Sequence, residues 1–371
     1  MSRVLTAYAV RRAHVLVVEV PGHWRLRAAV ERRARWRGWR LAESPADADV
    51  LAVCGVPGPE LARLVERVWS QLPGPRVRLD LGGPDGLEAA LDSAARRLAD
   101  TPSQRQDAQQ RSSSPDGAED HEDIDHKGMG HKGMDHDGIE PDGIPLAAGG
   151  EDRDGLEMDV LHLALGPVLR HWPAGLVLHC SLQGDVVVGA KASVVDEGQQ
   201  QADGVVPRLA DGPEVDAAWL CDNAAAVLAL AGWPDAASAA HRARDALLDG
   251  TDDATVQRGL ERLVRQVRSS RLLRWSLGGV GAVTAGDLER HRLPERLRGD
   301  VHDRLVAMLE QARDRQTAPG HFAAPAAADG SAAMLRALPD VVTGLDLAAT
   351  RLVVASLALA TVPSRQQVPH G

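Results

Sequence analysis

The chain has 371 residues, 44% of them hydrophobic and 25% charged, which is enough to bury two sizeable cores. Its net charge is −10, and one Phe and one Tyr stand beside eight Trp, a composition that argues against nucleic-acid binding. The three cysteines, Cys54, Cys180 and Cys221, lie far apart. Their spacing excludes a disulfide framework and any self-contained zinc or iron–sulfur motif of the C-x-x-C kind.

We expect neither a membrane span nor an export signal at the ends of this sequence. The apolar run Val4–Val10 is short and is followed by Arg11 and Arg12 rather than by a cleavage site. The most apolar stretch near the other end, Val353–Val362, is half of the roughly 20 residues that span a bilayer. We therefore expect a buried helix there and a cytoplasmic chain with no membrane span.

Composition divides the chain into three parts, namely residues 1–100, 101–155 and 156–371. The first carries 16 basic against 12 acidic residues, whereas the second carries 14 acidic against 5 basic residues. The second part is also rich in Ser, Gln, Pro and Gly, so it cannot bury enough apolar surface to fold alone. We predict a disordered acidic linker over 101–155 between two folded domains.

The first domain, 1–100, alternates short apolar runs with helical patterns. We expect strands at His14–Val20, Trp39–Ala42, Val50–Cys54 and Val77–Leu81, and helices at Trp24–Arg37, Glu60–Leu72 and Leu87–Leu98. This alternation predicts a small, flavodoxin-like parallel sheet covered on both faces. The simplest interpretation of the arginines in its first helix is a face exposed to solvent, and the alternative is a docking surface for an acidic partner. They are Arg25, Arg27, Arg32, Arg33, Arg35 and Arg37.

The last domain, 156–371, begins with a hairpin and continues as helices. Leu176–Leu182 and Val186–Ala190 flank the turn Gln183–Asp185, where a glycine supplies the positive φ that a tight turn requires. Helical patterns then cover Glu214–Ala231, Asp235–Leu248, Asp252–Arg274 and Leu338–Ala360. The fold class expected for the whole chain is α/β plus α+β, with a β-hairpin followed by a helical bundle in the second half.

A five-residue repeat within the linker is the candidate metal site. Between His121 and Pro145 the sequence reads HEDID, HKGMG, HKGMD, HDGIE and PDGIP. Imidazole suits copper, nickel and zinc, and thioether sulfur favours Cu(I). The candidate ligands are His121, His126, Met129, His131, Met134 and His136. The alternative is a solvent-exposed linker whose histidines and methionines increased in number only because the repeat was duplicated. Metal binding alone would not distinguish the two, because His-rich tracts bind metal whatever their purpose.

Three segments of 156–371 occur in the order found in one family. They are GPVLRHWPAGLVLHCSLQGDVVVGA from Gly166, RLLRWSLGGVGAVTAGDLERHRLPERLRGD from Arg271 and LPDVVTGLDLAATRLVVASL from Leu338. Together they resemble the 49-kDa-type, quinone-site subunit of NADH–quinone oxidoreductase and, more distantly, the large subunit of nickel–iron hydrogenases. DADVLAVCGVPGPELARLVERVWSQLPGPRVRL from Asp47 resembles the 20-kDa-type subunit, its usual neighbour, and more distantly the hydrogenase small subunit.

The departures from those families concern the metal ligands. An iron–sulfur cluster needs four thiolates, and Cys54 is the only cysteine of the first domain. Cys180 and Cys221 supply neither of the two cysteine pairs of the hydrogenase centre. In the altered turn of the hairpin segment, His171 is the one residue that could stand in for a ligand-contacting histidine. We expect no iron–sulfur or nickel cofactor, and a copper, nickel or zinc ion only at the repeat.

The resemblance implies a subunit of an oxidoreductase complex that is not catalytic alone. We expect a docking or regulatory component of a membrane-associated, NADH–quinone oxidoreductase-type complex. Its partners would be other subunits of a membrane-bound redox or ion-translocating assembly, which would place it peripherally on the inner face of the membrane. One alternative is a cytoplasmic metal-binding protein that uses the His/Met repeat. A second is a quinone oxidoreductase subunit that receives electrons from a partner.

Overall fold

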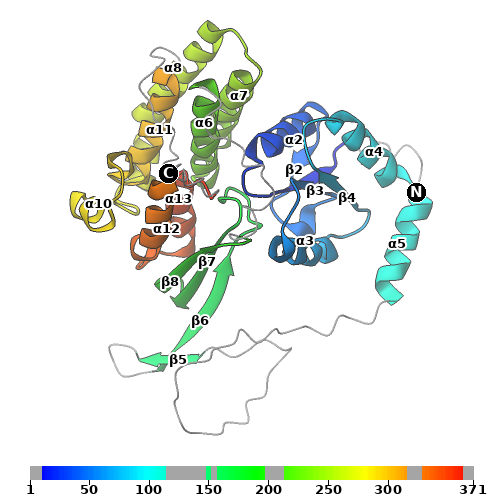
Figure 1. Cartoon of the computed structure of the whole chain (residues 1–371), viewed down its shortest axis with the longest axis horizontal. Helices are drawn as coiled ribbons and strands as arrows, with labels where there is room; N and C mark the ends of the chain where they lie inside the picture. Colours follow the sequence, from blue (N-terminus) through cyan, green and yellow to red (C-terminus); the bar gives the residue numbers. More distant parts are fainter. Residues whose placement is uncertain (1–10, 114–147, 152–156, 197–212, 316–327, 362–371) are drawn as a thin grey trace, which may run out of the picture.

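The computed structural model describes residues 11–113, 148–151, 157–196, 213–315 and 328–361. In these ranges a parallel sheet with flanking helices is followed by an antiparallel sheet and a helical region (Figure 1). The chain is therefore a mixed α/β protein. We call residues 11–113 the α/β module and the described residues from 148 onward the second module. No helix within these ranges combines the length and the apolar character that crossing a membrane requires.

The α/β module is built on four parallel strands in the order β2-β1-β3-β4. They are β1 (His14–Glu19), β2 (Arg40–Leu41), β3 (Val50–Cys54) and β4 (Val77–Leu81). Every residue of the central strand β3 is buried, as expected for a parallel sheet covered on both faces. Helices α2 (Trp24–Trp36) and α4 (Leu87–Ala99) cover one face, and α3 (Pro59–Gln71) covers the other.

Helix α5 (Thr101–Ser113) lies in the segment that we expected to belong to the linker. The Gln104 side chain accepts a hydrogen bond from the backbone of Arg76 (2.9 Å), and Asp107 pairs with the Arg76 guanidinium (3.1 Å). Arg76 in turn lies over the ring of Trp69, 4.2 Å from its centroid. A buried arginine thus anchors a helix whose own composition is polar. Residues 114–147 and 152–155 of the expected linker lie outside the described residues, whereas Ala148–Glu151, also predicted as linker, form a strand.

The second module opens with an antiparallel sheet in the order β5-β6-β7-β8. Its strands are β5 (Ala148–Glu151), β6 (Glu157–Leu165), β7 (Leu176–Gln183) and β8 (Val186–Val194). The predicted hairpin is present between β7 and β8, and Gly184 adopts a φ of 60° in its turn. Alternate residues of β7 are buried against the helices, namely Leu176, Leu178, Cys180 and Leu182. The sheet therefore presents one face to the core.

Eight helices of the described region complete the second module. They are α6 (Pro213–Leu230), α7 (Pro234–Leu248), α8 (Asp253–Ser269), α9 (Arg271–Leu277), α10 (Ala285–His291), α11 (Val301–Arg315), α12 (Ala328–Val342) and α13 (Leu347–Ser356). Two long helices that the periodicity predicted are each divided. Ser270 ends α8 and caps α9 by accepting from the backbone of Leu273. Gly344, with a φ of 86°, separates α12 from α13.

The glycine-rich turn of the Arg271 segment has a packing role. Gly281 has a φ of 53°, and a Cβ there would lie 2.1 Å from a methyl carbon of Val353 on α13. Its carbonyl accepts from the buried Arg304, which also donates to the carbonyl of Gly299 (2.6 Å). Only glycine fits this close approach. The turn before α10 therefore packs on α13 and is hydrogen-bonded to Arg304 of α11.

Helix α2 belongs to the cores of both modules. Leu26 and Val30 pack on the parallel sheet, whereas Trp24 and Ala28 pack among the helices of the second module. The ring of Trp24 meets that of Trp219 on α6 edge to face, with centroids 5.3 Å apart. On the opposite face of the parallel sheet, β7 shares a core with α3. The two modules consequently share apolar cores, which independent domains would not.

Asp196, just after β8, caps helix α3 from the other module. Its carboxylate accepts from the backbone N–H groups of Glu60 (2.9 Å) and Leu61 (3.0 Å). The Glu60 carboxylate accepts in return from the backbone of Asp196 (3.1 Å). This reciprocal arrangement is a capping box made between two modules. It occupies the exposed N–H groups of α3 at the carboxyl end of the parallel sheet.

We predict that Asp196→Ala lowers the free energy of unfolding by about 1–2 kcal/mol, because α3 loses its cap. Asp196 has a φ of 55°, so Asp196→Asn, which tolerates that conformation, separates the loss of charge from backbone strain. Urea unfolding measures both, with Asp185→Ala in the exposed hairpin turn as control. A change no larger than that of the control would show that the contact does not hold the modules together.

Candidate functional site

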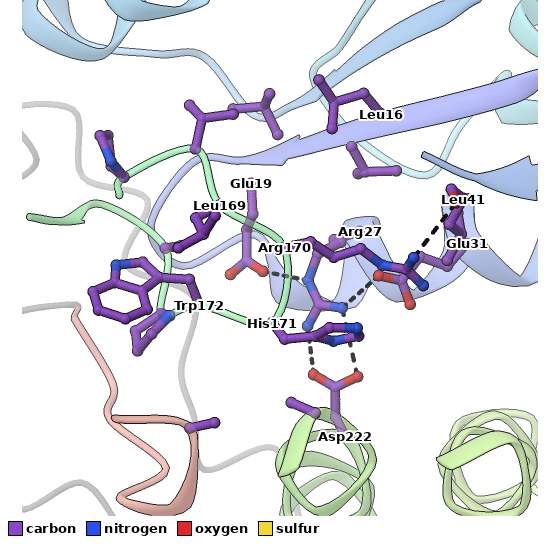
Figure 2. A pocket seen from close by; sticks show the side chains of 18 of the residues that line it. Leu16, Glu19, Arg27, Glu31, Leu41, Leu169, Arg170, His171, Trp172 and Asp222 are labelled. Carbon is purple, nitrogen blue, oxygen red and sulfur yellow. Dashed lines mark hydrogen bonds and ion pairs between the residues drawn. The ribbon is translucent and has the colours of Figure 1, made fainter. Parts of the chain in front are cut away.

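Charged residues gather where α2 meets the second module. Glu19 is the last residue of β1, and Arg27 lies on α2. Arg27 donates from Nε to Glu19 (2.5 Å) and from Nη1 to Glu31 (2.8 Å), which lies one helical turn further along. Its guanidinium also binds the carboxylate of Asp222 on α6, as Figure 2 shows. A single arginine therefore bridges a strand end, its own helix and the other module.

Arg244 of α7 closes the arrangement from the other side. Its side chain is fully buried, and Nη1 donates to both Glu31 (2.8 Å) and Asp222 (2.6 Å). Its Nη2 donates to Asp245 (2.8 Å). Two guanidiniums thus alternate with two carboxylates in a closed ring. What we call the ion-pair cluster consists of Glu19, Arg27, Glu31, Asp222 and Arg244.

The electrostatics of the cluster favour charged carboxylates in its centre. Burial would raise the pKa of Asp222, but Arg27 and Arg244 outweigh it and hold that pKa at about 2. Burial would also raise the pKa of Glu31, but Arg27 and Arg244 hold that pKa well below its usual value. At Glu19, burial outweighs the attraction of Arg27 and raises the pKa, and the neighbouring carboxylates of Asp222 and Glu31 act in the same direction as burial. Buried ions are stable only when paired in this way, so each member depends on the others.

Further arginines of α2 extend the contact outward and correct our first interpretation of them. Arg32 pairs with Asp249, and Arg35 pairs with Asp245 (2.9 Å), both at the end of α7. We favoured a solvated face for these arginines, but the structure places several in ion pairs with the second module. The alternative, a surface for an acidic partner, describes them better, and that partner is part of the same chain. Their spacing on one helix could not reveal it.

A cavity of about 130 Å³ adjoins the ion-pair cluster between the modules. The turn between β6 and β7 forms one wall, where His171 adopts a φ of 59° and extends toward Arg27 and Asp222 (Figure 2). Trp172 is fixed in the same turn by a hydrogen bond to the carbonyl of Leu176 (2.8 Å). His171 is the one histidine that the sequence singled out in this turn, and the structure places it at the cavity.

Two neutral imidazoles line this cavity. Burial, with the charge of Arg170 as the next cause, lowers the pKa of His171 to about 4 against the opposing effect of Glu31. Burial likewise lowers the pKa of His241, on α7, to about 3, with Arg244 as the next cause. Both rings are therefore uncharged at neutral pH. They can accept or donate one hydrogen bond at each nitrogen, but they add no charge to the cluster.

A wider groove of about 590 Å³ lies next to the cavity and is rimmed by arginines. Arg351 donates to the backbone carbonyl of Arg170 (3.2 Å), while its Nε is buried without a partner among the described residues. Burial lowers the pKa of both Arg170 and Arg351, although Arg170 also forms an ion pair with Glu43 of the groove wall. Arg35 and Arg40 complete the rim. Chemically, this groove suits an anionic group better than a cation.

Two groups of described residues have the ligand types of a metal site. Atoms of Glu31, Asp222 and His241 all lie within 4.8 Å of one another. Both carboxylates already bind Arg27 and Arg244, so a cation there would face two guanidiniums. The second group is Asp300, His302 and Asp303, in which each aspartate accepts from a backbone N–H at the start of α11. The first arrangement does not favour a cation.

The predicted metal ligands of the five-residue repeat lie outside the described residues. These are His121, His126, Met129, His131, Met134 and His136. The three cysteines are all buried, and burial raises the pKa of each thiol, so none is a ready thiolate. The residues that do converge, Glu31, Asp222, His241 and Arg244, were not predicted. The only local signal was the four-residue spacing of Arg27 and Glu31 on one helix.

We predict that Asp222→Asn lowers the free energy of unfolding by about 3 kcal/mol, because the buried Arg244 and the half-buried Arg27 lose a shared counter-charge. The matched control is Glu295→Gln, which breaks an exposed pair with Arg298 and should cost under about 0.5 kcal/mol. Chemical denaturation of the two variants measures the difference. Equal losses would mean that the cluster contributes no more than a surface ion pair.

The neutral histidines predict a pH dependence. Between pH 6.5 and about 4 the unfolded chain binds protons that the folded chain refuses at His171 and His241, so stability falls as the pH falls through this window. His241→Gln removes one such site and should reduce the slope by about 1.4 kcal/mol per pH unit. Unfolding measured at several pH values, with the exposed His179→Gln as control, tests this. An unchanged slope for His241→Gln would contradict it.

No protein-family model matches the chain, and no curated protein matches it either.

Proposed function

We propose that this chain is a structural subunit of a membrane-associated, NADH–quinone oxidoreductase-type complex without a redox centre of its own. In this proposal the α/β module and the second module correspond to fused, reduced forms of the 20-kDa-type and 49-kDa-type subunits. The strand order β2-β1-β3-β4 is compatible with the flavodoxin-like arrangement that we expected for the first of them. The second module supplies the sheet and helices expected for the other.

One observation carries the proposal, namely that the second module covers the carboxyl end of the parallel sheet. Ligands of open α/β sheets bind at this end, where the strand order reverses. Here Glu19, at the end of β1, belongs to the ion-pair cluster. The N-terminus of α3, which follows β3, is capped by Asp196. The positions that would serve a ligand instead hold the two modules together.

The residues at the ends of β1 and β3 also lack redox chemistry of their own. Cys54 ends β3 beside Glu19, is fully buried, and has a thiol pKa raised by burial and by the Glu19 carboxylate. A single buried thiol cannot replace the four thiolates of a tetranuclear cluster. The features shared with the resembled families are a hairpin, a glycine-rich turn and packed helices. These shape a surface rather than a catalytic centre.

The cavity favours this structural role over retained quinone chemistry. Pockets that hold drug-sized organic ligands measure about 300–1,000 Å³ and are mostly apolar. The cavity beside His171 has a volume of about 130 Å³ and is lined by Arg27, Glu31 and Asp222. The larger groove is open and rimmed by arginines. A quinone ring would have to replace solvent around charged groups in either place, at a substantial desolvation cost.

A second candidate function is metal binding by the five-residue repeat. The observation that favours it is the regular return of histidine at every fifth position from His121 to His136. Copper, nickel and zinc are the ions that such ligands suit. In this alternative the folded modules serve to present the repeat, and no membrane partner is required.

Purification of the tagged chain from its own host in mild detergent tests both proposals on one preparation. The structural role predicts stoichiometric co-purification of membrane subunits of an ion-translocating or redox complex. A variant with all four repeat histidines replaced by serine should retain these partners. A chain that elutes without partners but carries about one equivalent of copper, nickel or zinc, lost in this variant, would instead support metal binding.

A further inference from the structure

A basic surface with two exposed apolar side chains lies on α8 and α9, away from the ion-pair cluster. Residues 253–277 contain two acidic residues, Asp253 and Glu261, against six arginines. The arginines are Arg258, Arg262, Arg265, Arg268, Arg271 and Arg274, and all six are exposed. Helix α8 packs on α7 and α11 (Figure 1), and its inward residues Leu260, Leu263 and Val267 are buried. We call the outward side of α8 and α9 the basic surface.

The arginines of this surface are largely uncompensated. Arg258, Arg262 and Arg265 follow one another at spacings of four and three residues, which places them on one side of α8. Arg268 pairs with Glu310 at 3.0 Å. Among the described residues, no ion pair is formed by Arg262, Arg265, Arg271 or Arg274. A run of positive charge therefore faces solvent on a chain whose net charge is negative.

Two exposed apolar side chains project from α9. Leu272 is 73% exposed and Trp275 is 81% exposed, whereas Leu273 and Leu277 of the same short helix are buried. Leu272 and Trp275 are three residues apart, so they lie on one side of α9, and each directly follows an arginine, Arg271 or Arg274. Fully exposed Trp and Leu among arginines are the side chains that enter the headgroup region of a bilayer.

We propose that the basic surface binds the surface of an anionic phospholipid bilayer. Arginines attract acidic headgroups, and Trp275 with Leu272 insert at the boundary of the acyl chains. Two apolar side chains are a small area compared with the roughly 800 Å² that each partner buries in a stable protein interface. One exposed tryptophan also provides too few stacking positions for single-stranded nucleic acid. Binding to a lipid surface requires neither a large apolar interface nor several stacking aromatic rings.

This inference goes beyond the proposed function and does not rest on it, because it needs no protein partner. Purified chain is sedimented with vesicles of phosphatidylcholine alone and with an equal mixture of phosphatidylcholine and phosphatidylglycerol. We expect binding only to the mixed vesicles, weakening as salt is added. Arg262→Gln with Arg265→Gln should weaken binding about 25-fold, near fivefold for each arginine. Trp275→Ser should weaken it as well and abolish the blue shift of tryptophan emission on binding.

Matched controls lie on the α/β module. Arg63→Gln with Arg67→Gln removes the same charge from exposed positions of α3, and Trp36→Ser removes a tryptophan that is 66% exposed. These variants should bind mixed vesicles as the unaltered chain does. Equal binding to both vesicle types, no binding at low salt, or equal losses in the control variants would overturn the proposal. Tighter binding of polyuridylic acid that also depends on Trp275 would overturn it in favour of nucleic acid.

Discussion

The pairing of Arg27 and Arg244 with Glu31 and Asp222 is the interaction on which the arrangement of the molecule depends. Glu31, Asp222 and Arg244 are buried and Arg27 is half-buried, and the two guanidiniums keep both carboxylates charged despite burial. The ring ties α2 of the α/β module to α6 and α7 of the second module. Because the hydrogen bonds between a guanidinium and a carboxylate are directional, the ring favours one orientation of the two modules. Next to the ring of charges, the contact of Trp24 with Trp219 buries apolar surface, which stabilises the same boundary.

This use of charge explains why the carboxyl end of the parallel sheet is not an open site. In a single α/β domain, the end of β1 and the start of α3 would be available to a ligand. Here Glu19 is drawn into the ion-pair cluster, and Asp196 caps α3 from the second module. Both contacts need the second module. The boundary retains a small cavity with two neutral histidines and a groove rimmed by arginines.

The sequence predicted elements whose pattern is local and missed those that depend on distant partners. Val50–Cys54 and Val77–Leu81 were predicted at their observed bounds, because short apolar runs between turn residues have few alternatives. Helix α5 was missed, because its stability comes from Arg76, more than twenty residues earlier. The break at Ser270 was missed, because apolar periodicity continues across it.

The candidate site was hidden for the same reason. Arg27 meets Asp222 across 195 positions, and nothing in either helix distinguishes these residues from exposed ones. His171 could be singled out only because its turn resembles that of a known family. The repeat histidines, by contrast, were conspicuous in the sequence alone, since a five-residue period requires no folded partner to be seen. Composition therefore placed the candidate site in the linker, whereas the buried charged residues of the structure place it at the boundary between the modules.

The central claim is that the two modules form one cooperative unit held by buried ion pairs and shared cores. Native-state hydrogen exchange across a urea series tests it most directly, with β3 reporting on the α/β module and α6 on the second module. One unit predicts that the most protected amides of β3 and α6 open with the same free energy and the same urea dependence. Distinct opening free energies, with β3 exchanging while α6 stays protected or the reverse, would contradict it.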